Sequence, residues 1–224
     1  MIPQGNIPLS GFHDLVSIFI AGHKTLIKQA EADRFLFPCL LKFLKEINPK
    51  TEVFFEVVNK LERFDAVIAE LDNKSTTIPF EKYFGKYPNI IRKKRNSLAV
   101  LSGNESEEDL LKLGEDIFQN FGIGSRNVSK VYIPKGYDLK HFLEVLHNFK
   151  YLVLNNKYKN NFDYNFSLYS LNRVPFNING CVILLEAKEL KSRIGSLHYE
   201  FYDDVKAVEK DLESLSPESL GHRQ

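Results

Sequence analysis

The sequence predicts an α/β fold in which helices cover both faces of mostly parallel strands. Two observations lead to this prediction. Segments with apolar residues at helical spacing alternate with short apolar runs along most of the chain. The chain has 224 residues, of which 43% are hydrophobic and 26% charged, and this is the composition of a globular protein with one large domain or two small ones.

The first half of the chain begins with a helix. Ser10 is the expected N-cap, apolar residues recur at helical spacing over residues 12–20, and Gly22 supplies the stop. A second apolar stripe predicts a helix over residues 35–47, which Asn48-Pro49 ends. The other elements expected in this half are strands at residues 25–27, 52–58 and 64–69 and a weaker helix at residues 80–84.

The second half continues the alternation through a tight turn. A strand at residues 98–101 precedes a long helix whose buried side runs over residues 110–121. Gly122 and Gly124 permit a sharp turn before a strand at residues 128–134. The other expected elements are helices near residues 138–149 and 203–215, strands near residues 182–185 and 195–202, an Asn- and Lys-rich surface loop at residues 155–165 and a polar tail at residues 216–224.

Composition and missing motifs argue against several classes of function. The 30 Lys and Arg residues balance 29 Asp and Glu residues, and the formal net charge of +1 gives no overall attraction for nucleic acid. The basic run Arg92–Arg95 is therefore interpreted as a solvated edge or a local salt-bridge partner. Neither the histidines nor Cys39 and Cys181 have metal-ligand spacing, so no metal site is predicted. The sequence contains no P-loop and no Gly-x-Gly-x-x-Gly.

The cysteines and the hydropathy pattern predict the cellular setting. Two distant cysteines do not make a disulfide framework, which favours the cytoplasm. The first residues lack the pattern of a signal peptide, and no run of about 18 apolar residues occurs. We therefore expect a cytoplasmic protein without a membrane span.

Three segments, taken in order, carry a resemblance to a known family. Gly5–Leu9 precedes a helix, Ile27–Glu31 ends a strand, and Phe121–Lys130 links a long helix to a strand. These landmarks resemble the aldehyde dehydrogenase superfamily, and the surrounding sequence is similar to its acyl-CoA reductase branch, the LuxC-type fatty-acid reductases of luminescent and related bacteria. The resemblance runs from about Gly5 to about Leu212 and is also carried by residues 6–14, 83–88, 95–101 and 198–200.

The resemblance implies an enzyme that reduces a fatty acyl thioester to an aldehyde with NADPH. Ser125 stands where the family has the cysteine that takes the acyl group. Asn6 matches an amide that forms an oxyanion hole with the backbone N–H of residue 125, although a local turn bond before the helix is the alternative interpretation. Lys28 and Glu31 match the Lys-x-x-Glu pattern that holds the adenosine ribose and its 2′-phosphate.

The resemblance also implies how the chain is divided and what it meets. Residues 1–96 are expected to form the NADPH-binding part of an aldehyde dehydrogenase-like, Rossmann-like fold, and residues 97–215 the catalytic part. The implied partners are long-chain acyl-CoA or an acyl carrier, and a second copy in a homo-oligomer. Family members have additional sequence before Asn6 and after Leu215, so a partial chain is expected.

Three departures from the family leave the function open. Ser125 lacks the easily ionised thiol, and a hydroxyl needs an adjacent base that the sequence does not show. Glu70-Leu71-Asp72 adds bulk and negative charge where the family has a small turn at the cofactor pyrophosphate. The third departure is that the chain lacks the additional sequence that family members have before Asn6 and after Leu215. The alternatives are a reductase whose serine is engineered or decayed, an inactive remnant that binds nucleotide or acyl-CoA weakly or serves as an interaction module, and an acyltransferase that uses Ser125 itself.

Overall fold

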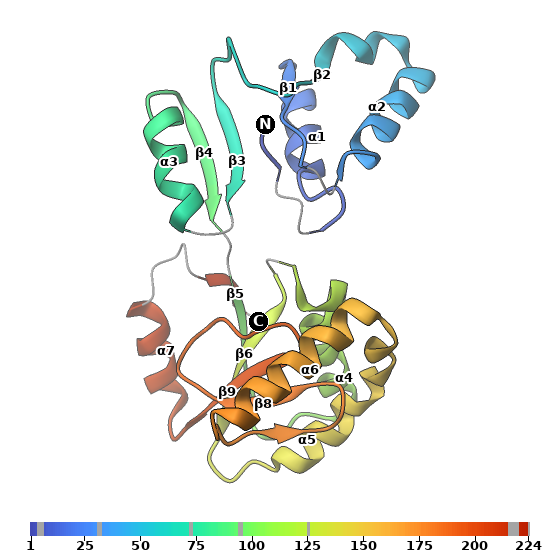
Figure 1. The fold of residues 1–224 in the computed structure, drawn as a ribbon. Coiled ribbons are helices and arrows are strands. Elements are labelled where there is room, and N and C mark those ends of the chain that lie inside the picture. Colours follow the sequence, from blue (N-terminus) through green and yellow to red (C-terminus); the bar gives the residue numbers. More distant parts are fainter. Residues whose placement is uncertain are drawn as a thin grey trace. The chain divides into compact units, whose positions relative to one another are not determined.

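A computed structural model shows two compact units, Met1–Lys94 and Arg95–Gln224 (Figure 1). The structure describes residues 1–3, 7–30, 33–71, 74–93, 96–124, 126–214 and 220–223. The two units are called unit 1 and unit 2. Within the described part of the chain, no helix has the length and apolar character needed to cross a membrane.

Unit 1 contains two pairs of parallel strands that the first three residues join. β1 (Thr25–Ile27) pairs with β2 (Phe55–Val57), and β3 (Val67–Leu71) pairs with β4 (Asn89–Lys93). The amine of Met1 donates to the Leu26 carbonyl (2.6 Å), and the Lys28 N–H donates to the Met1 carbonyl (3.0 Å). On the other side the Ile2 N–H donates to the Ile68 carbonyl at 2.8 Å, in a parallel bridge. Residues 1–3 therefore act as the central strand of one parallel sheet.

Three α-helices lie beside these strands. α1 (Phe12–Ile20) and α2 (Leu36–Ile47) bury Leu15 and Phe37 in a core that includes Met1 and Ile27. α3 (Lys74–Phe84) packs Phe80 against Val67 and Ala69 of β3. A 3-10 helix, η2 (Pro49–Phe54), leads from α2 into β2.

Unit 2 is built on a six-stranded sheet with the order β10-β5-β6-β9-β8-β7. All neighbouring strands are parallel except β7 and β8. The strands are β5 (Asn96–Val100), β6 (Val128–Pro134), β7 (Asn177–Ile178), β8 (Ile183–Glu186), β9 (Ser196–Tyr202) and β10 (Leu220–Arg223).

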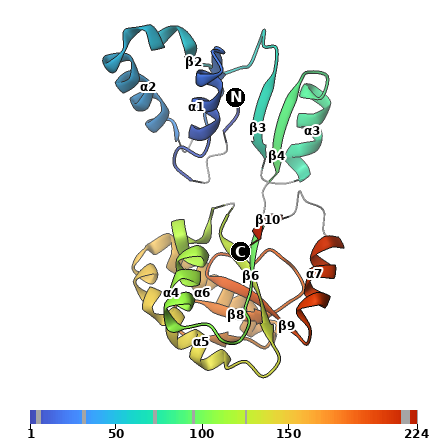
Figure 2. The same cartoon turned by 180° about the vertical axis from the view of Figure 1, so that it is seen from behind.

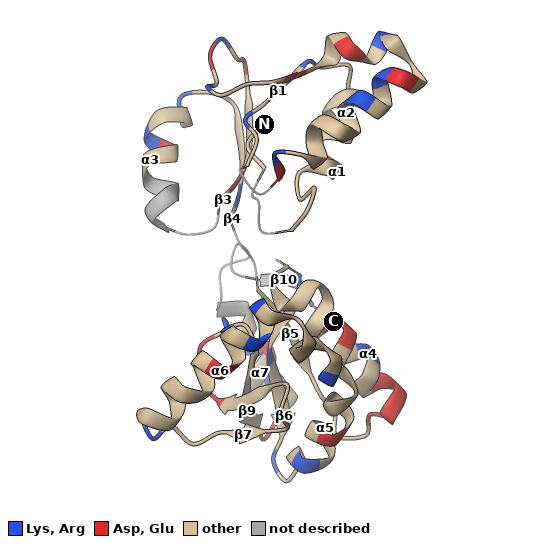
Figure 3. Ribbon diagram, turned by 45° about the vertical axis from the view of Figure 1, so that its right-hand side comes forward, with Lys and Arg blue, Asp and Glu red and all other residues tan. Residues whose placement is uncertain are grey.

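Helices cover both faces of this sheet (Figures 1 and 2). One face packs against α4 (Glu107–Phe118) and α5 (Leu139–Leu146), with Val131, Ile133 and Leu197 at the centre of the core. The other face meets α6 (Asn156–Leu171) and α7 (Val205–Ser214). Two 3-10 helices, η3 (Gln119–Gly122) and η4 (His147–Leu154), follow α4 and α5. Acidic residues cluster in the first turn of α4 (Figure 3), where a capping box formed by Ser106 and Asp109 begins the helix.

The surface loop expected at residues 155–165 was a wrong prediction, because this segment forms most of α6. Asn155 caps the helix by accepting hydrogen bonds from the Lys157 and Tyr158 N–H groups. Tyr158, Phe162 and Asn165 are buried at helical spacing. The Asn165 amide donates to the Ile194 carbonyl at 2.9 Å, so a long-range contact stabilises a segment whose composition favours a loop.

Several predicted boundaries also differ from the structure. The strand expected at residues 52–58 is reduced to β2 because η2 takes its first half, and the strand expected at 64–69 begins at Val67. The long helix ends at Phe118 rather than continuing to Phe121, and the first helix has Gly11 rather than Ser10 at its N-cap. The structure also contains three strands that were not predicted. β4 covers part of the basic run, β7 precedes β8, and β10 lies inside the expected polar tail.

Candidate functional site

The carboxyl ends of the central strands of unit 1 form the candidate nucleotide site. Numbered in chain order with residues 1–3 as the first strand, the sheet has the order 3-2-1-4-5. The order reverses between residues 1–3 and β3. In open α/β sheets, ligands bind outside the carboxyl ends of the strands at such a reversal. The strand ends at Pro3, Ile27 and Leu71 therefore lie at the edge where a ligand would bind.

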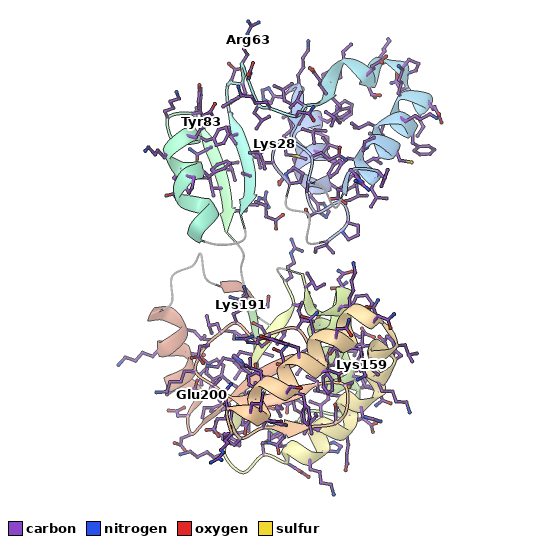
Figure 4. The ribbon with its side chains drawn as sticks, viewed as in Figure 1. Lys28, Arg63, Tyr83, Lys159, Lys191 and Glu200 are labelled. Carbon is purple, nitrogen blue, oxygen red and sulfur yellow. The ribbon has the colours of Figure 1, made fainter. Side chains whose placement is uncertain are left out.

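Among the residues predicted to form the site, Lys28 is the one that the structure describes. It comes directly after β1 (Figure 4). Its backbone N–H is held by the Met1 carbonyl, whereas its side chain is exposed. Within the described residues, no carboxylate forms an ion pair with its ammonium group. An exposed cation at the carboxyl end of a central strand suits a phosphate group.

Asp33 ties together two of the segments at these strand ends. It is 1% exposed, and its carboxylate oxygens accept from the Leu9 N–H at 3.2 and 3.1 Å. The Asp33 N–H donates to the Ala30 carbonyl at 3.0 Å. Leu9 has a φ of +57°, which a non-glycine residue adopts only under constraint. The buried carboxylate thus fixes the segment after residues 1–3 against the segment after β1.

The other predicted site residues lie outside the described residues. Asn6, Glu31 and Ser125 are among them, so their predicted roles stay predictions. Asp72, part of the Glu70-Leu71-Asp72 segment that departs from the family pattern, also lies outside the described residues. The structure therefore brings none of the predicted catalytic and cofactor residues together, and it places only Lys28.

The segment that leads to position 125 is a constrained turn in unit 2. Asn120 and Phe121 have φ values of +49° and +59°, and Gly122 follows at +72°. The buried side-chain amide of Asn127 donates to the carbonyls of Asp116 (2.9 Å), Ile117 (3.2 Å) and Gln119 (2.8 Å). These bonds satisfy orphan carbonyls at the end of α4. Sequence reasoning found the glycines of this turn but missed Asn127.

Cys181 does not have the properties of a catalytic thiolate. Cys181 is buried, and burial raises the pKa of its thiol to about 11, against the opposing effect of a hydrogen bond to Asn179. A nucleophilic cysteine needs the opposite shift. Cys39 is exposed on α2. Among the residues that the structure describes, no three His, Cys, Asp or Glu side chains are grouped as metal ligands.

A second polar cluster lies on the sheet of unit 2 under residues 188–190, which we call the strap. Lys130 is 1% exposed, and its ammonium group donates to Glu200 (2.6 Å) and to the strap carbonyl of residue 188 (2.8 Å). Ser129 donates to the carbonyl of residue 190 at 2.6 Å. His198 Nδ1 lies 2.9 Å from the carbonyl of residue 189, which can only accept, so Nδ1 carries the proton. Figure 4 shows Glu200 on β9. These bonds give His198 a structural role.

Comparison with known proteins identifies the fold. No protein-family model matches the sequence, and no curated protein does. Among solved structures, a mutant aldehyde dehydrogenase from Bacillus cereus matches with a TM-score of 0.73 and 12% identity over 96% of this chain and 52% of that chain. Aldehyde dehydrogenase 21 from Physcomitrella patens, in complex with succinate, matches with a TM-score of 0.71 and 13% identity over 96% and 53%. Indole-3-acetaldehyde dehydrogenase complexed with NAD+ matches with a TM-score of 0.69 and 11% identity over 93% and 52%.

These matches confirm the predicted fold class. The chain has an α/β, aldehyde dehydrogenase-like fold, in which unit 1 is the Rossmann-like part and unit 2 the following α/β part. The chain spans about half the length of the solved structures described above. At these levels of identity the likeness concerns the fold alone.

Proposed function

We propose that this chain carries the NADPH-binding and acyl-accepting parts of an oxidoreductase that reduces a fatty acyl thioester to an aldehyde. The observation that carries the proposal is the position of Lys28. Its exposed ammonium group follows the strand next to the point where the strand order reverses, in a fold shared with an aldehyde dehydrogenase that was solved with NAD+. Glu31, three residues later, supplies a carboxylate suited to ribose hydroxyl groups.

The proposed chemistry begins with attack on the thioester carbonyl by the side chain of residue 125. The tetrahedral oxyanion would accept hydrogen bonds from the Asn6 amide and the backbone N–H of residue 125. The bond to the thiol carrier then breaks, and the carrier leaves as a thiolate that takes up the proton lost by the attacking side chain. NADPH, when bound, supplies the hydride that reduces the resulting acyl group to the aldehyde. The side chain of residue 125 is released for another cycle.

The residue at position 125 decides whether this sequence of steps is completed. A serine hydroxyl is a poorer nucleophile than a thiolate unless a base activates it, and its oxyester is less electrophilic than a thioester. We therefore expect the chain with Ser125 to stop before acyl transfer, and a cysteine at this position to allow it. This expectation separates a disabled reductase from an inactive remnant and from a serine acyltransferase.

Intact-mass measurement after incubation with palmitoyl-CoA tests the acyl step. Ser125→Cys is prepared in a Cys39→Ala background, because Cys39 is exposed and a surface thiol can be acylated on its own. Cys39→Ala with Ser125 unchanged is the matched control. We expect a palmitoyl-sized mass increase only in the Ser125→Cys protein, followed by release of aldehyde when NADPH is added. An adduct on the control would indicate a serine acyltransferase, and no adduct on either protein would favour the inactive remnant.

The cofactor assignment is tested by titrating the protein with NADPH and NADH. Lys28→Gln is expected to weaken NADPH binding by about tenfold, which corresponds to about 1.4 kcal/mol, and to leave NADH binding nearly unchanged. The physical reason is that only NADPH has the 2′-phosphate that the ammonium group would pair with. Lys24→Gln, an exposed lysine just before β1, is the control. If Lys28→Gln weakened the binding of NADPH and NADH equally, the assigned role of Lys28 would be contradicted. The same holds if Lys24→Gln weakened NADPH binding as much as Lys28→Gln does.

A further inference from the structure

Unit 2 contains a cavity that none of the proposed steps uses. It lies between the end of α4, η3 and η4, and its volume is about 790 Å³. This volume is within the range of cavities that hold small organic molecules. Its apolar lining comes from Phe118, Phe121, Phe149, Tyr151, Leu152 and Leu154.

The apolar lining continues from the floor of the cavity to its mouth. Phe118 and Phe149 are buried, and their ring centroids are 5.0 Å apart. The ring of Tyr151 follows at 6.2 Å from Phe149 and is 59% exposed. Leu154, at the mouth, is 82% exposed. A row of apolar side chains left in water beside a cavity is typical of a binding site for an apolar ligand.

The wall that carries Phe121 is held in a strained backbone conformation. Asn120 and Phe121 both have positive φ, and the three hydrogen bonds of Asn127 fix the end of α4 from which this turn starts. Strain of this kind persists only where the surrounding structure determines it. The floor depends on Gly114, because a Cβ at this position would collide with the ring of Phe149. The hydrogen bonds of Asn127 and the packing of Phe149 on Gly114 therefore fix the shape of the cavity.

Charge restricts the ligands that the cavity can accept. Glu115 and Asp116 are among its lining residues, whereas no Lys, Arg or His is among them. Glu115 is exposed and Asp116 is half-buried, and their carboxylates repel an anion. A small organic cation would suit the charge, but it would leave most of the volume and most of the apolar lining unused. An extended uncharged chain fits both the volume and the lining.

We propose that this cavity holds a neutral aliphatic chain. This inference rests on the proposed function, under which the ligand is the acyl chain of the thioester. Phe121 in the cavity wall precedes Ser125 by four residues in the sequence. The aliphatic chain of the ligand therefore enters the cavity beside the segment that carries the acyl-accepting position. The carboxylates of Glu115 and Asp116 exclude the anionic carrier, and only the uncharged tail enters.

The test is a titration of the protein with 1-dodecanol, followed by NMR of protein labelled with ¹³C in its leucine methyl groups. We expect saturable shifts of the Leu152 and Leu154 methyl signals. Leu154→Asn is expected to weaken dodecanol binding by five- to tenfold. Leu171→Asn is the matched control, since Leu171 is 83% exposed on α6 and does not line the cavity.

The outcomes separate this inference from the proposed function. Absence of saturable dodecanol shifts, equal losses in the two leucine variants, or tighter binding of tetramethylammonium than of dodecanol would each overturn the inference. If dodecanol binds with the expected dependence on Leu154 while Ser125→Cys takes no acyl group, the cavity is an aliphatic site and the proposed reaction is wrong. If Ser125→Cys is acylated while Leu154→Asn changes nothing, the reaction stands and the acyl chain lies elsewhere.

Discussion

Replacing Asn127 by aspartate is expected to lower the free energy of unfolding of unit 2 by about 3 kcal/mol or more. The two side chains have nearly the same shape, so the effect is electrostatic. The Asn127 amide donates to three backbone carbonyls at the end of α4. A carboxylate has no hydrogen to donate, and it would face three carbonyl oxygens in a position that is 8% exposed.

Urea unfolding followed by circular dichroism measures this change. Asn172→Asp is the matched control, because Asn172 is exposed after the end of α6 and its amide donates to one carbonyl only; we expect a loss below about 1 kcal/mol there. The difference between the two variants should shrink as the pH falls, since a protonated carboxyl group at position 127 can donate again. Equal losses at neutral pH would show that Asn127 does not hold the end of α4.

Glu200→Ala is expected to cost unit 2 about 3 kcal/mol of unfolding free energy. Its partner Lys130 is the buried member of the pair, with a side chain that is 1% exposed against 31% for Glu200. Truncating Glu200 leaves an ammonium group in the core with one backbone carbonyl and the face of the Tyr132 ring. A buried charge that has lost its counter-charge is more costly than a missing contact.

A nearby ion pair offers the control for this prediction. Lys135 and Asp203 also join the region of β6 to that of β9 at 2.6 Å, but their side chains are 64% and 73% exposed. Asp203→Ala is therefore expected to change the unfolding free energy by about 0–1 kcal/mol. Lys130→Met keeps the apolar stem and removes the charge, so it should be milder than Glu200→Ala. A larger loss in Lys130→Met than in Glu200→Ala would contradict the explanation by an unpaired buried cation.

The parts of the fold that could be predicted from the sequence are those with strong local signals. The second helix was expected at residues 35–47 and is observed as Leu36–Ile47, because a continuous apolar stripe and Asn48-Pro49 define it. Gly22 has a φ of +79° after α1, as expected for its stop. α6 was missed because only Tyr158, Phe162 and Asn165 of this polar segment are buried, and the partner of Asn165 is 29 residues away in the sequence.

The same distinction applies to the candidate site. The position of Lys28 after a strand follows from local sequence, and the structure shows it there. Asn127 and Lys130 lie in a segment that carries the family resemblance, but nothing in the sequence indicated the role of either side chain. The carbonyl partners of Asn127 come from the preceding helix, and the partners of Lys130 are 58 and 70 residues away. A side chain whose role depends on where distant backbone carbonyls end up cannot be recognised before the chain is folded.

The central position of residues 1–3 has a consequence for how this chain is made. Translation produces these residues before the strands on their two sides, β1 and β3, leave the ribosome. β1 with β2 and β3 with β4 are each pairs of neighbours in the chain, and residues 1–3 join the two pairs. A nascent chain that ends before Leu71 therefore cannot close this sheet, although it already contains every residue of the core around Ile27 and Phe37. Residues 1–3 are therefore paired on one edge until β3 is made, and β3 in turn gains its second neighbour only with β4.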